Sequence, residues 1–565
     1  MAFDLEQRQT AALQEMLQLK RPQLSLFGAR GAADTPGSTR SQHTPKSPWK
    51  VLIFDDVAKD ILAPLMTGAV GSVVSVVERH VNFICLSPFE FSLRLPSLFS
   101  SIYAAAADAE VTAAINAAAN GLLSVIATLG VLPVINCPSS VSSPARSVAL
   151  RLQELLEALP PKAFAEMFGS AATSLSKPLL ILIDRDFDLL TMLQHTWLYG
   201  ALIHDLLQLR LNRVTVVTPG EGGKPSTTKT FDLEKRDVFW REHAFSPFPV
   251  AAAAVSQMLT EYNAELAKVG QRPPDAFAQP EGDLSADILK AVDVLPDLAD
   301  KKRSLDAHTT IATALVSAIK DRGLDRYFEI EQSLPQDRET VVTSAVQQCL
   351  SPDSAGLVED KLRLLACLYL SRPSYPKPLF QSLVSQLEQQ GADVSAIHFL
   401  SRFSAFRSID LGQQNPVSSG VSSGVSSGVS SASTALEGIG TKFLDKGRGL
   451  LQGVKNLLVR KSSPITQLLE RLLEGQEETG RQFIHLRRGQ QSSGASSTTV
   501  SPGGTATRGP PVRQAIIFVV GGGSYVEAAA VRELAAKTQK QLIFGSTEFV
   551  TPSEFLKELT QLGHA

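Results

Sequence analysis

Two apolar runs, each followed by a turn and a helix-like pattern, constrain this fold more than any other feature. Pro178–Ile183 (PLLILI) leads through DRDFDL into a helical run at His195–Leu211, and Gln514–Val520 (QAIIFVV) leads through GGGSY into another helical run. Continuous apolar runs of this length are typical of strands buried on both faces of a parallel sheet. Because parallel strands need crossover connections, these units predict an α/β domain. Shorter runs predict further strands at Lys50–Phe54, Asn82–Leu86, Val131–Ile135 and Gln541–Phe544, and a closing helix at Pro552–Leu562.

The pattern between the two units, from about residue 250 to 410, is helical only. The expected helices are Val250–Val269, Ala286–Val294, Leu305–Arg322, Glu359–Ser371 and Leu379–Gln390. The fold class is therefore α/β with an inserted all-α domain. A perfect VSSG repeat at 417–431 follows this block and predicts a flexible linker.

Charge and cysteine content exclude several classes of protein. The net charge of −2 argues against a nucleic-acid partner, which needs a basic excess on the domain. The four cysteines show no metal-ligand spacing and predict free thiols in a reducing compartment. The stretch between Glu110 and Arg146 lacks charge, but Gly130 and Pro133 interrupt it. It predicts a buried helix at Val111–Leu129 rather than a membrane span.

Two turns carry residues that could serve chemistry. Residues 521–525 (GGGSY) follow a strand as phosphate loops do, but Val526 breaks the GxGxxG spacing. The carboxylates of Asp184, Asp186 and Asp188 resemble the DxD of enzymes that use nucleotide sugars. Arg185 lies among them and no second acidic or histidine cluster completes a metal shell. His195 and His204, expected on one helix, are too far apart to share a metal. We therefore assign no catalytic, metal-binding or cofactor-binding residue and expect no enzyme.

A basic amphipathic segment at 436–461 predicts a membrane contact. Its apolar side chains repeat at helical spacing, and the segment contains six basic residues and two acidic ones. Such a helix can enter a lipid interface while Lys and Arg meet anionic headgroups, although docking back on the protein is an equal alternative. The candidate contact residues are Ile439, Lys442, Phe443, Lys446, Leu450, Leu451, Val454, Lys455 and Leu457.

Several stretches, taken together, resemble the Sec-one/Munc-eighteen (SM) family, and its Sly-one branch in particular. The most specific is KPLLILIDRDFDLLTMLQHTWLYGALIHDLLQLRLNRV (Lys177–Val214), which looks like the core of the family's second domain. The other matching stretches are Gln7–Leu17, Trp49–Leu65, Asp232–Ala252, Lys301–Gln332, Glu359–Ser371 and Gln514–Glu527. The resemblance implies an arch-shaped, non-catalytic clasp that binds a Qa-SNARE (a syntaxin) and assembled SNARE bundles during vesicle fusion. The branch implies syntaxin-five or syntaxin-eighteen types, ER–Golgi transport, and a cytoplasmic protein peripherally associated with those membranes.

The chain departs from the family after Leu65, where several dozen residues of the first α/β domain are missing. The pocket for the syntaxin N-terminal peptide draws on that stretch, so its residues are unknown here. We expect residues 1–100 to hold an N-terminal helix and a shortened first α/β domain. The other expected segments are a second α/β domain at 101–249 and 511–565, a helical third domain at 250–410, a linker with the amphipathic helix at 411–463, and a helix with a disordered loop at 464–510.

The helical domain is the expected site of SNARE contact. Leu305–Arg322 is amphipathic and offers a face to a partner helix, with Leu305, His308, Ile311, Leu315 and Lys320 as candidates. The alternative for these residues is packing inside their own domain. Two other functions stay open at this point: an α/β enzyme that uses nucleotide sugars or phosphate, and a scaffold or tether that does not bind SNAREs.

Overall fold

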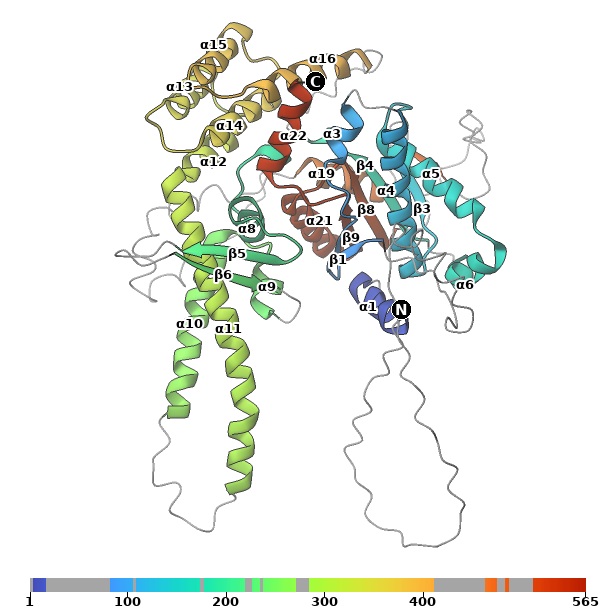
Figure 1. The fold of residues 1–565 in the computed structure, drawn as a ribbon, viewed down its shortest axis with the longest axis vertical. Helices are drawn as coiled ribbons and strands as arrows, with labels where there is room; N and C mark the ends of the chain where they lie inside the picture. The colour runs from blue at the N-terminus through green and yellow to red at the C-terminus, as the bar shows by residue number, and fades with distance from the viewer. Residues whose placement is uncertain are drawn as a thin grey trace, which may run out of the picture.

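The computed structural model shows an arch with two limbs (Figure 1). One limb is built on a mixed sheet, the other is a long helical hairpin, and a group of helices joins them at the top. The structure describes residues 4–16, 82–104, 108–172, 177–218, 226–233, 237–270, 284–410, 463–474, 483–486 and 512–564.

The sheet limb contains seven strands in the order β1-β2-β9-β8-β4-β3-β7. The strands from β2 through β3 run parallel, and β1 and β7 add antiparallel edges. Alternate residues of β4 and β8 enter two separate apolar cores, one on each face of the sheet, as expected for strands without a solvated face. The strands are β1 (Ile84–Ser87), β2 (Glu90–Ser92), β3 (Val134–Pro138), β4 (Leu179–Asp184), β7 (Phe483–Leu486), β8 (Gln514–Val520) and β9 (Gln541–Ser546).

Helices cover both faces of this sheet. On one face lie α1 (Leu5–Met16), α4 (Asp108–Leu129), α5 (Pro144–Ala158) and α6 (Pro161–Ala172). On the other lie α19 (Pro464–Glu474) and α21 (Tyr525–Thr538). Helix α4 is long and apolar enough to span a membrane by length and composition alone. Its second half is buried against the sheet, as the sequence predicted, although the helix begins at Asp108 and the next strand at Val134.

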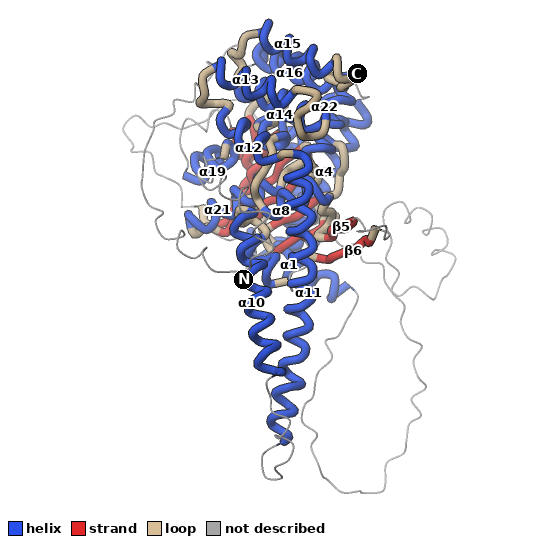
Figure 2. Tube along the Cα trace, turned by 90° about the vertical axis from the view of Figure 1, so that its left-hand side faces the viewer, coloured by secondary structure: helices blue, strands red, loops and turns tan. Residues whose placement is uncertain are grey.

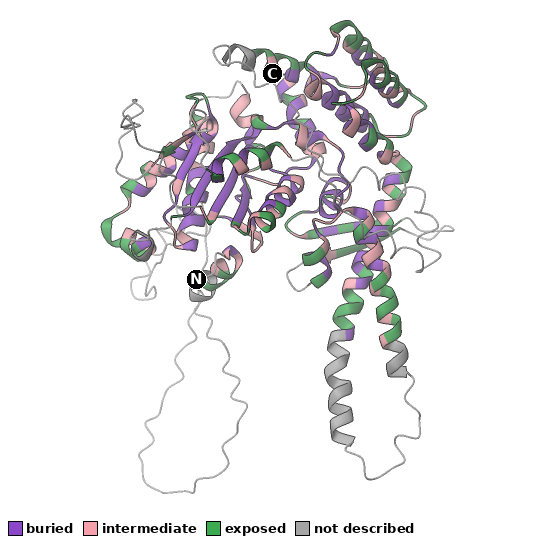
Figure 3. Cartoon of the chain, turned by 180° about the vertical axis from the view of Figure 1, so that it is seen from behind, coloured by how far each residue is buried: buried purple, intermediate pink, exposed green. Residues whose placement is uncertain are grey.

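The second limb and the top of the arch are helical. Helices α10 and α11 form a hairpin that projects from the body (Figures 1 and 2), and its exposed residues stand out in Figure 3, whereas buried residues fill the sheet. The helices of this part are α9 (Val238–His243), α10 (Phe248–Gly270), α11 (Leu284–Arg322), α12 (Leu324–Ser333), α13 (Glu339–Leu350), α14 (Val358–Ser371), α15 (Lys377–Glu388) and α16 (Ser395–Asp410).

Short elements connect the two limbs. Strands β5 and β6 pair as an antiparallel ribbon beside α11, and α22 packs on α16. These connecting elements are α3 (Leu98–Tyr103), the 3-10 turn η1 (Arg185–Phe187), α7 (Leu190–Leu193), α8 (Tyr199–Leu207), β5 (Arg213–Thr218), β6 (Thr227–Asp232) and α22 (Pro552–His564).

Three sequence predictions need correction. Ala286–Val294 and Leu305–Arg322 are parts of one helix, α11, which continues through Pro296. The helical run at His195–Leu211 is helical only within α8, because the Tyr199 N–H is used by Ser246 O and Gln208 ends the helix in a left-handed conformation. The expected helix shared by His195 and His204 therefore does not exist.

The third correction concerns the N-terminal region. The strand expected at Asn82–Leu86 was assigned to a separate first α/β domain. In the structure β1 and β2 extend the main sheet next to β9, with Phe91 opposite Gly545 and buried in the same core as α4. That assignment was wrong, because a strand of three or four residues is stabilised by whichever sheet edge it meets, and local sequence does not specify the edge. The other strand of that domain, Lys50–Phe54, lies outside the described residues.

Candidate functional site

The DRDFD turn after β4 is filled by contacts within the protein. Asp184 accepts hydrogen bonds from the Ala145 N–H (2.6 Å) and the Ser143 hydroxyl, so it holds the N-terminus of α5. Asp188 does the same for α7, accepting from the Thr191 N–H at 3.0 Å and from its hydroxyl at 2.6 Å. Carboxylates at helix N-termini satisfy orphan backbone donors. These two aspartates are therefore structural caps.

Arg185 crosses from this turn to the GGGSY turn. Its guanidinium donates to Glu527 Oε2 at 2.8 Å and to Gly522 O at 3.2 Å, and both charged side chains are 1% exposed. Burial opposes the charge on Arg185, but the neighbouring Glu527 carboxylate outweighs it and raises the pKa of the guanidinium. Arg185 and Glu527 thus form one buried ion pair that joins the turns following β4 and β8. These are the two turns that suggested an enzyme.

The amides of the GGGSY turn are already occupied. The N–H groups of Gly521 and Gly522 donate to Thr547 Oγ1 at 3.2 and 2.9 Å, and the Ser524 N–H donates to Glu527 Oε2 at 3.0 Å. Gly521 and Gly522 have φ near +100°, and a Cβ on Gly522 would approach Val550 Cγ2 to 2.9 Å. The glycines therefore serve a tight, closely packed turn. A phosphate would have to displace internal partners, and this geometry does not fit a phosphate site.

A network of buried charges fixes the joint of the arch. His195, in the connecting segment between α7 and α8, approaches Glu331 of α12 through Nδ1 at 2.7 Å and Asp360 of α14 through Nε2 at 3.3 Å. Arg322, at the end of α11, donates to Asp360 at 3.0 Å. Burial and the Arg363 charge disfavour the protonated ring, but Glu331 and Asp360 outweigh them and raise the pKa of His195. The network therefore holds the hairpin and the top helices in one orientation.

A second cross-link lies beside it. Arg363 of α14 is fully buried and makes a bidentate pair with Asp205 of α8, at 3.2 and 3.0 Å, and donates to Leu193 O at 2.8 Å. Bidentate guanidinium–carboxylate pairs fix geometry as well as charge. Sequence reasoning did not identify this residue, although a single arginine within LRLLACLYL was a visible sign of a buried charge.

The candidate groove residues on α11 do not reach the surface, with one exception. Leu305, His308, Ile311 and Leu315 are at most 5% exposed, and only Lys320 of the five candidates is exposed. The three apolar residues belong to the largest core. His308 lies between the Tyr199 hydroxyl (2.8 Å from Nδ1) and Asp237 (2.9 Å from Nε2). The prediction that these four side chains line a groove is wrong, because helical periodicity reports an apolar face without saying what covers it.

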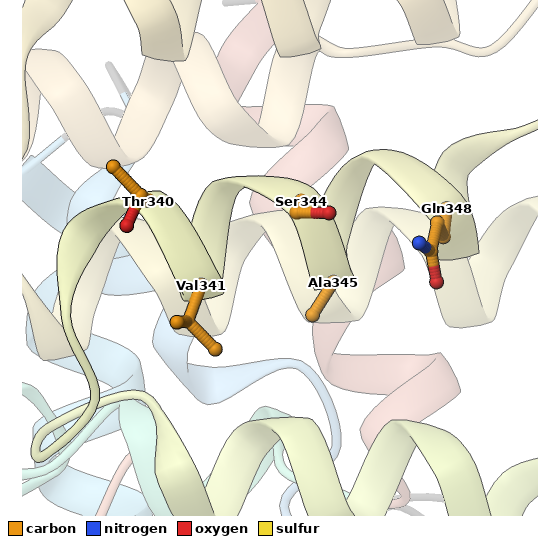
Figure 4. A pocket seen from close by; sticks show the side chains of 5 residues that line it. All are labelled: Thr340, Val341, Ser344, Ala345 and Gln348. Atoms are coloured by element: carbon orange, nitrogen blue, oxygen red, sulfur yellow. The ribbon is translucent and has the colours of Figure 1, made fainter.

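The surface of α11 that is accessible is polar. Exposed side chains recur along it at spacings of three, four and seven residues: Lys302, Asp306, Thr313, Ser317 and Lys320. On the top helices, a shallow hollow of about 410 Å³ runs along α13. It is lined by Thr340, Val341, Ser344, Ala345 and Gln348, with Val341 and Ala345 pointing to the same side (Figure 4).

Two other expectations can be placed. Within the part of the chain that the structure describes, no group of three or more His, Cys, Asp or Glu side chains could hold a metal. The candidate membrane-contact residues, from Ile439 to Leu457, lie outside the described residues, and they remain a prediction.

Comparison with known proteins identifies the family. The model of the Sec1 family matches residues 43–558, which is most of the chain. This chain belongs to the Sec1 family. Among curated relatives, protein sly1 of Schizosaccharomyces pombe is 31% identical over 509 residues, covering 86% of this chain and 77% of the relative. Sec1 family domain-containing protein 1 of Mus musculus is 31% identical over 542 residues, covering 90% of this chain and 80% of the relative. The predicted family and branch are confirmed.

Solved structures agree on the fold. The structure of Sly1p in complex with an N-terminal peptide of Sed5p has a TM-score of 0.67 at 24% identity, covering 90% of this chain and 78% of that one. The SM protein Vps45 in complex with the Qa SNARE Tlg2 has a TM-score of 0.63 at 20% identity, covering 90% of this chain and 80% of that one. The arch with an α/β limb and an inserted helical domain is therefore the fold of SM proteins.

Proposed function

We propose that this Sec1 family member binds a Qa-SNARE and assembled SNARE bundles, and regulates vesicle docking and membrane fusion in ER–Golgi transport. The observation that carries the proposal is the family match across residues 43–558, together with relatives of the Sly1 type. The two related structures contain a Sed5p peptide and the Qa SNARE Tlg2 respectively, and we bring the same class of partner, a syntaxin-five or syntaxin-eighteen type, to this chain.

The protein acts as a binding clasp without catalysis. Asp184, Arg185 and Asp188 are used as caps and as an ion pair, and the GGGSY amides have internal acceptors. A catalytic constellation needs groups aimed at an open site. The turns that suggested a nucleotide-sugar enzyme support the fold, and this supports a non-enzymatic role.

The SNARE contacts the outer side of the α10–α11 hairpin. Its polar stripe of exposed residues on α11 runs along a projecting helix, which gives a partner helix a long, accessible surface (Figure 2). Polar and charged side chains on such a surface set the register of a partner helix. The buried network around His195 links the end of α11, through Arg322, to α12, α14 and the segment before α8.

The protein works in the cytoplasm and associates peripherally with ER and Golgi membranes. The basic amphipathic segment at 436–461 supplies the contact with anionic lipid, by the charge and spacing of its sequence.

A pull-down tests the function. Purified full-length protein is passed over immobilised cytosolic domains of syntaxin-five-type and syntaxin-eighteen-type Qa-SNAREs, with a Qa-SNARE of the plasma membrane as control. We expect retention on one of the first two. Folded protein that none of the three SNAREs retains would mean that the chain is a scaffold or tether instead.

A further inference from the structure

The outer edge of β1 is covered by a side chain instead of another strand. Among the residues that the structure describes, β1 is the terminal strand of the sheet, and β2 pairs with its inner side. On its outer side the Gln9 carboxamide, carried by α1, donates from Nε2 to Phe83 O at 2.8 Å. The same carboxamide accepts from the Cys85 N–H at 3.3 Å through Oε1. One residue of a parallel strand would make this same pair of bonds on either side of Ile84.

A second carboxamide covers the other end of this edge. Asn212, in the left-handed turn before β5, donates from Nδ2 to Leu86 O at 2.6 Å. The strand therefore has its outward backbone groups held by Gln9 near its start and by Asn212 near its end. Neither side chain comes from a neighbouring segment of the chain, so folding of the whole limb is needed to complete the cover.

Helix α1 is anchored for this role by Leu5 in its first turn. Leu5 is fully buried and packs in the core that holds Phe83, Phe91 and the buried part of α4. Asp4 caps the helix by accepting from the Gln7 N–H at 2.9 Å. Among residues 4–11, the part of this segment whose side chains the structure describes, Leu5 is the buried apolar residue. A segment near a chain terminus can open locally while the rest of the fold persists.

The strand beneath this cover would pair readily if it were uncovered. Charged residues and prolines keep edge strands from pairing with other chains. The sequence of β1, ICLS, contains neither. Two copies of one short, uncharged edge can pair about a two-fold axis without placing like charges opposite each other.

We infer that α1 is a built-in guard of the β1 edge, and that its release lets two copies of this chain pair through β1. While α1 is docked, two copies of the chain cannot associate through β1. When α1 undocks, the β1 strands of two copies form an isologous interface. The inference rests on residues 4–11, residues 82–92 and Asn212, and does not depend on the proposed SNARE partner.

Cys85 reports on the guard directly. It is the one half-buried cysteine, and Cys137, Cys349 and Cys367 are buried. Burial, with the Glu6 and Asp4 carboxylates of the α1 segment, raises the pKa of the Cys85 thiol to about 12. While α1 is docked, the thiol is shielded and protonated. Release of α1 removes both effects, so the alkylation rate of Cys85 measures undocking.

The experiment compares full-length wild type with the Leu5→Asp/Gln9→Leu double variant, and with Gln7→Leu as the matched control, because Gln7 is an exposed residue of the same helix. Peptide mass spectrometry measures the rate of maleimide labelling at Cys85. Light scattering measures the molecular mass of the protein over a range of concentrations. We expect Cys85 of the double variant to label at least about tenfold faster, as two lost hydrogen bonds and a lost anchor require. We also expect it to form a concentration-dependent dimer.

A further variant separates specific pairing from misfolding. Adding Ile84→Lys to the double variant places a charge on the uncovered edge, which should return the protein to a monomer while Cys85 stays fast to label. Unchanged labelling in the double variant would overturn the guard. Fast labelling with a mass that stays monomeric, or an association that Ile84→Lys leaves unchanged, would overturn the pairing through β1.

Discussion

Replacing Arg185 by Met should destabilise the sheet limb by about 3–5 kcal/mol, the cost of leaving one partner of a buried ion pair uncompensated. The variant leaves Glu527 buried at 1% exposure without the guanidinium that lies 2.8 Å away. It also removes the donor to Gly522 O. Methionine has a similar length, so the loss is one of charge and hydrogen bonds more than of packing.

Unfolding in guanidinium chloride followed by circular dichroism measures this cost, because it reports the strands and helices of the sheet limb, whereas Trp197 and Trp240 lie in the core of the helical part. The expected shift of the midpoint is about 1 M. The control is Arg185→Met with Glu527→Gln, which removes the stranded charge and keeps an oxygen that can accept from the Ser524 N–H. The double variant should recover most of the loss. A cost below about 1 kcal/mol for Arg185→Met, or a double variant no better than the single one, would refute the account of this turn.

Three further outcomes are expected. Burial raises the pKa of Glu90 to about 7 in spite of the nearby Arg532. The stabilising contribution of the protonated carboxyl is therefore complete below about pH 4.5 and is lost as pH rises through 7. Relative to wild type, Glu90→Gln should be more stable at pH 8 than at pH 5, and identical pH profiles in thermal unfolding would contradict this. Asp184→Asn should lower stability through the α5 cap by about 1 kcal/mol, and hydrolysis of a nucleotide sugar by wild type that this variant abolishes would contradict a structural role. In liposome flotation, wild type should float with anionic vesicles and lose this binding as the salt concentration rises. The Phe443→Asp/Leu450→Asp variant should not float. Equal flotation of the two proteins would place the membrane contact elsewhere.

The interior strands of the sheet were predictable from local sequence. Gln514–Val520 is β8 without any shift of boundary, and Pro178–Ile183 differs from β4 by one residue. Both are buried on two faces, so their apolar runs carry the whole signal. The helical nature of the insertion was readable for the same reason, since amphipathic periodicity is a local property.

What the sequence could not supply is the identity of partners far apart in the chain. β2 lies beside β9, more than four hundred residues away, and nothing in EFS specifies that neighbour. The apolar face of α11 looked like a groove, but the protein's own core covers it. Arg363 and Glu331 gain their roles only when α12, α14 and the segment at His195 meet. Site residues that depend on such meetings need the fold to be seen.

The measurement that tests the central claim most directly is site-specific crosslinking to a Qa-SNARE. A photoreactive amino acid is placed at Ser317, on the exposed stripe of α11, and in a second protein at Ser385, an exposed serine on α15. Each is illuminated with the cytosolic domain of a syntaxin-five-type SNARE. The account predicts a crosslinked product at Ser317 that excess unlabelled SNARE competes away, with little product at Ser385. Equal yields at both positions, or no product at Ser317 from protein that retains its fold, would contradict a SNARE-binding surface on the α10–α11 hairpin.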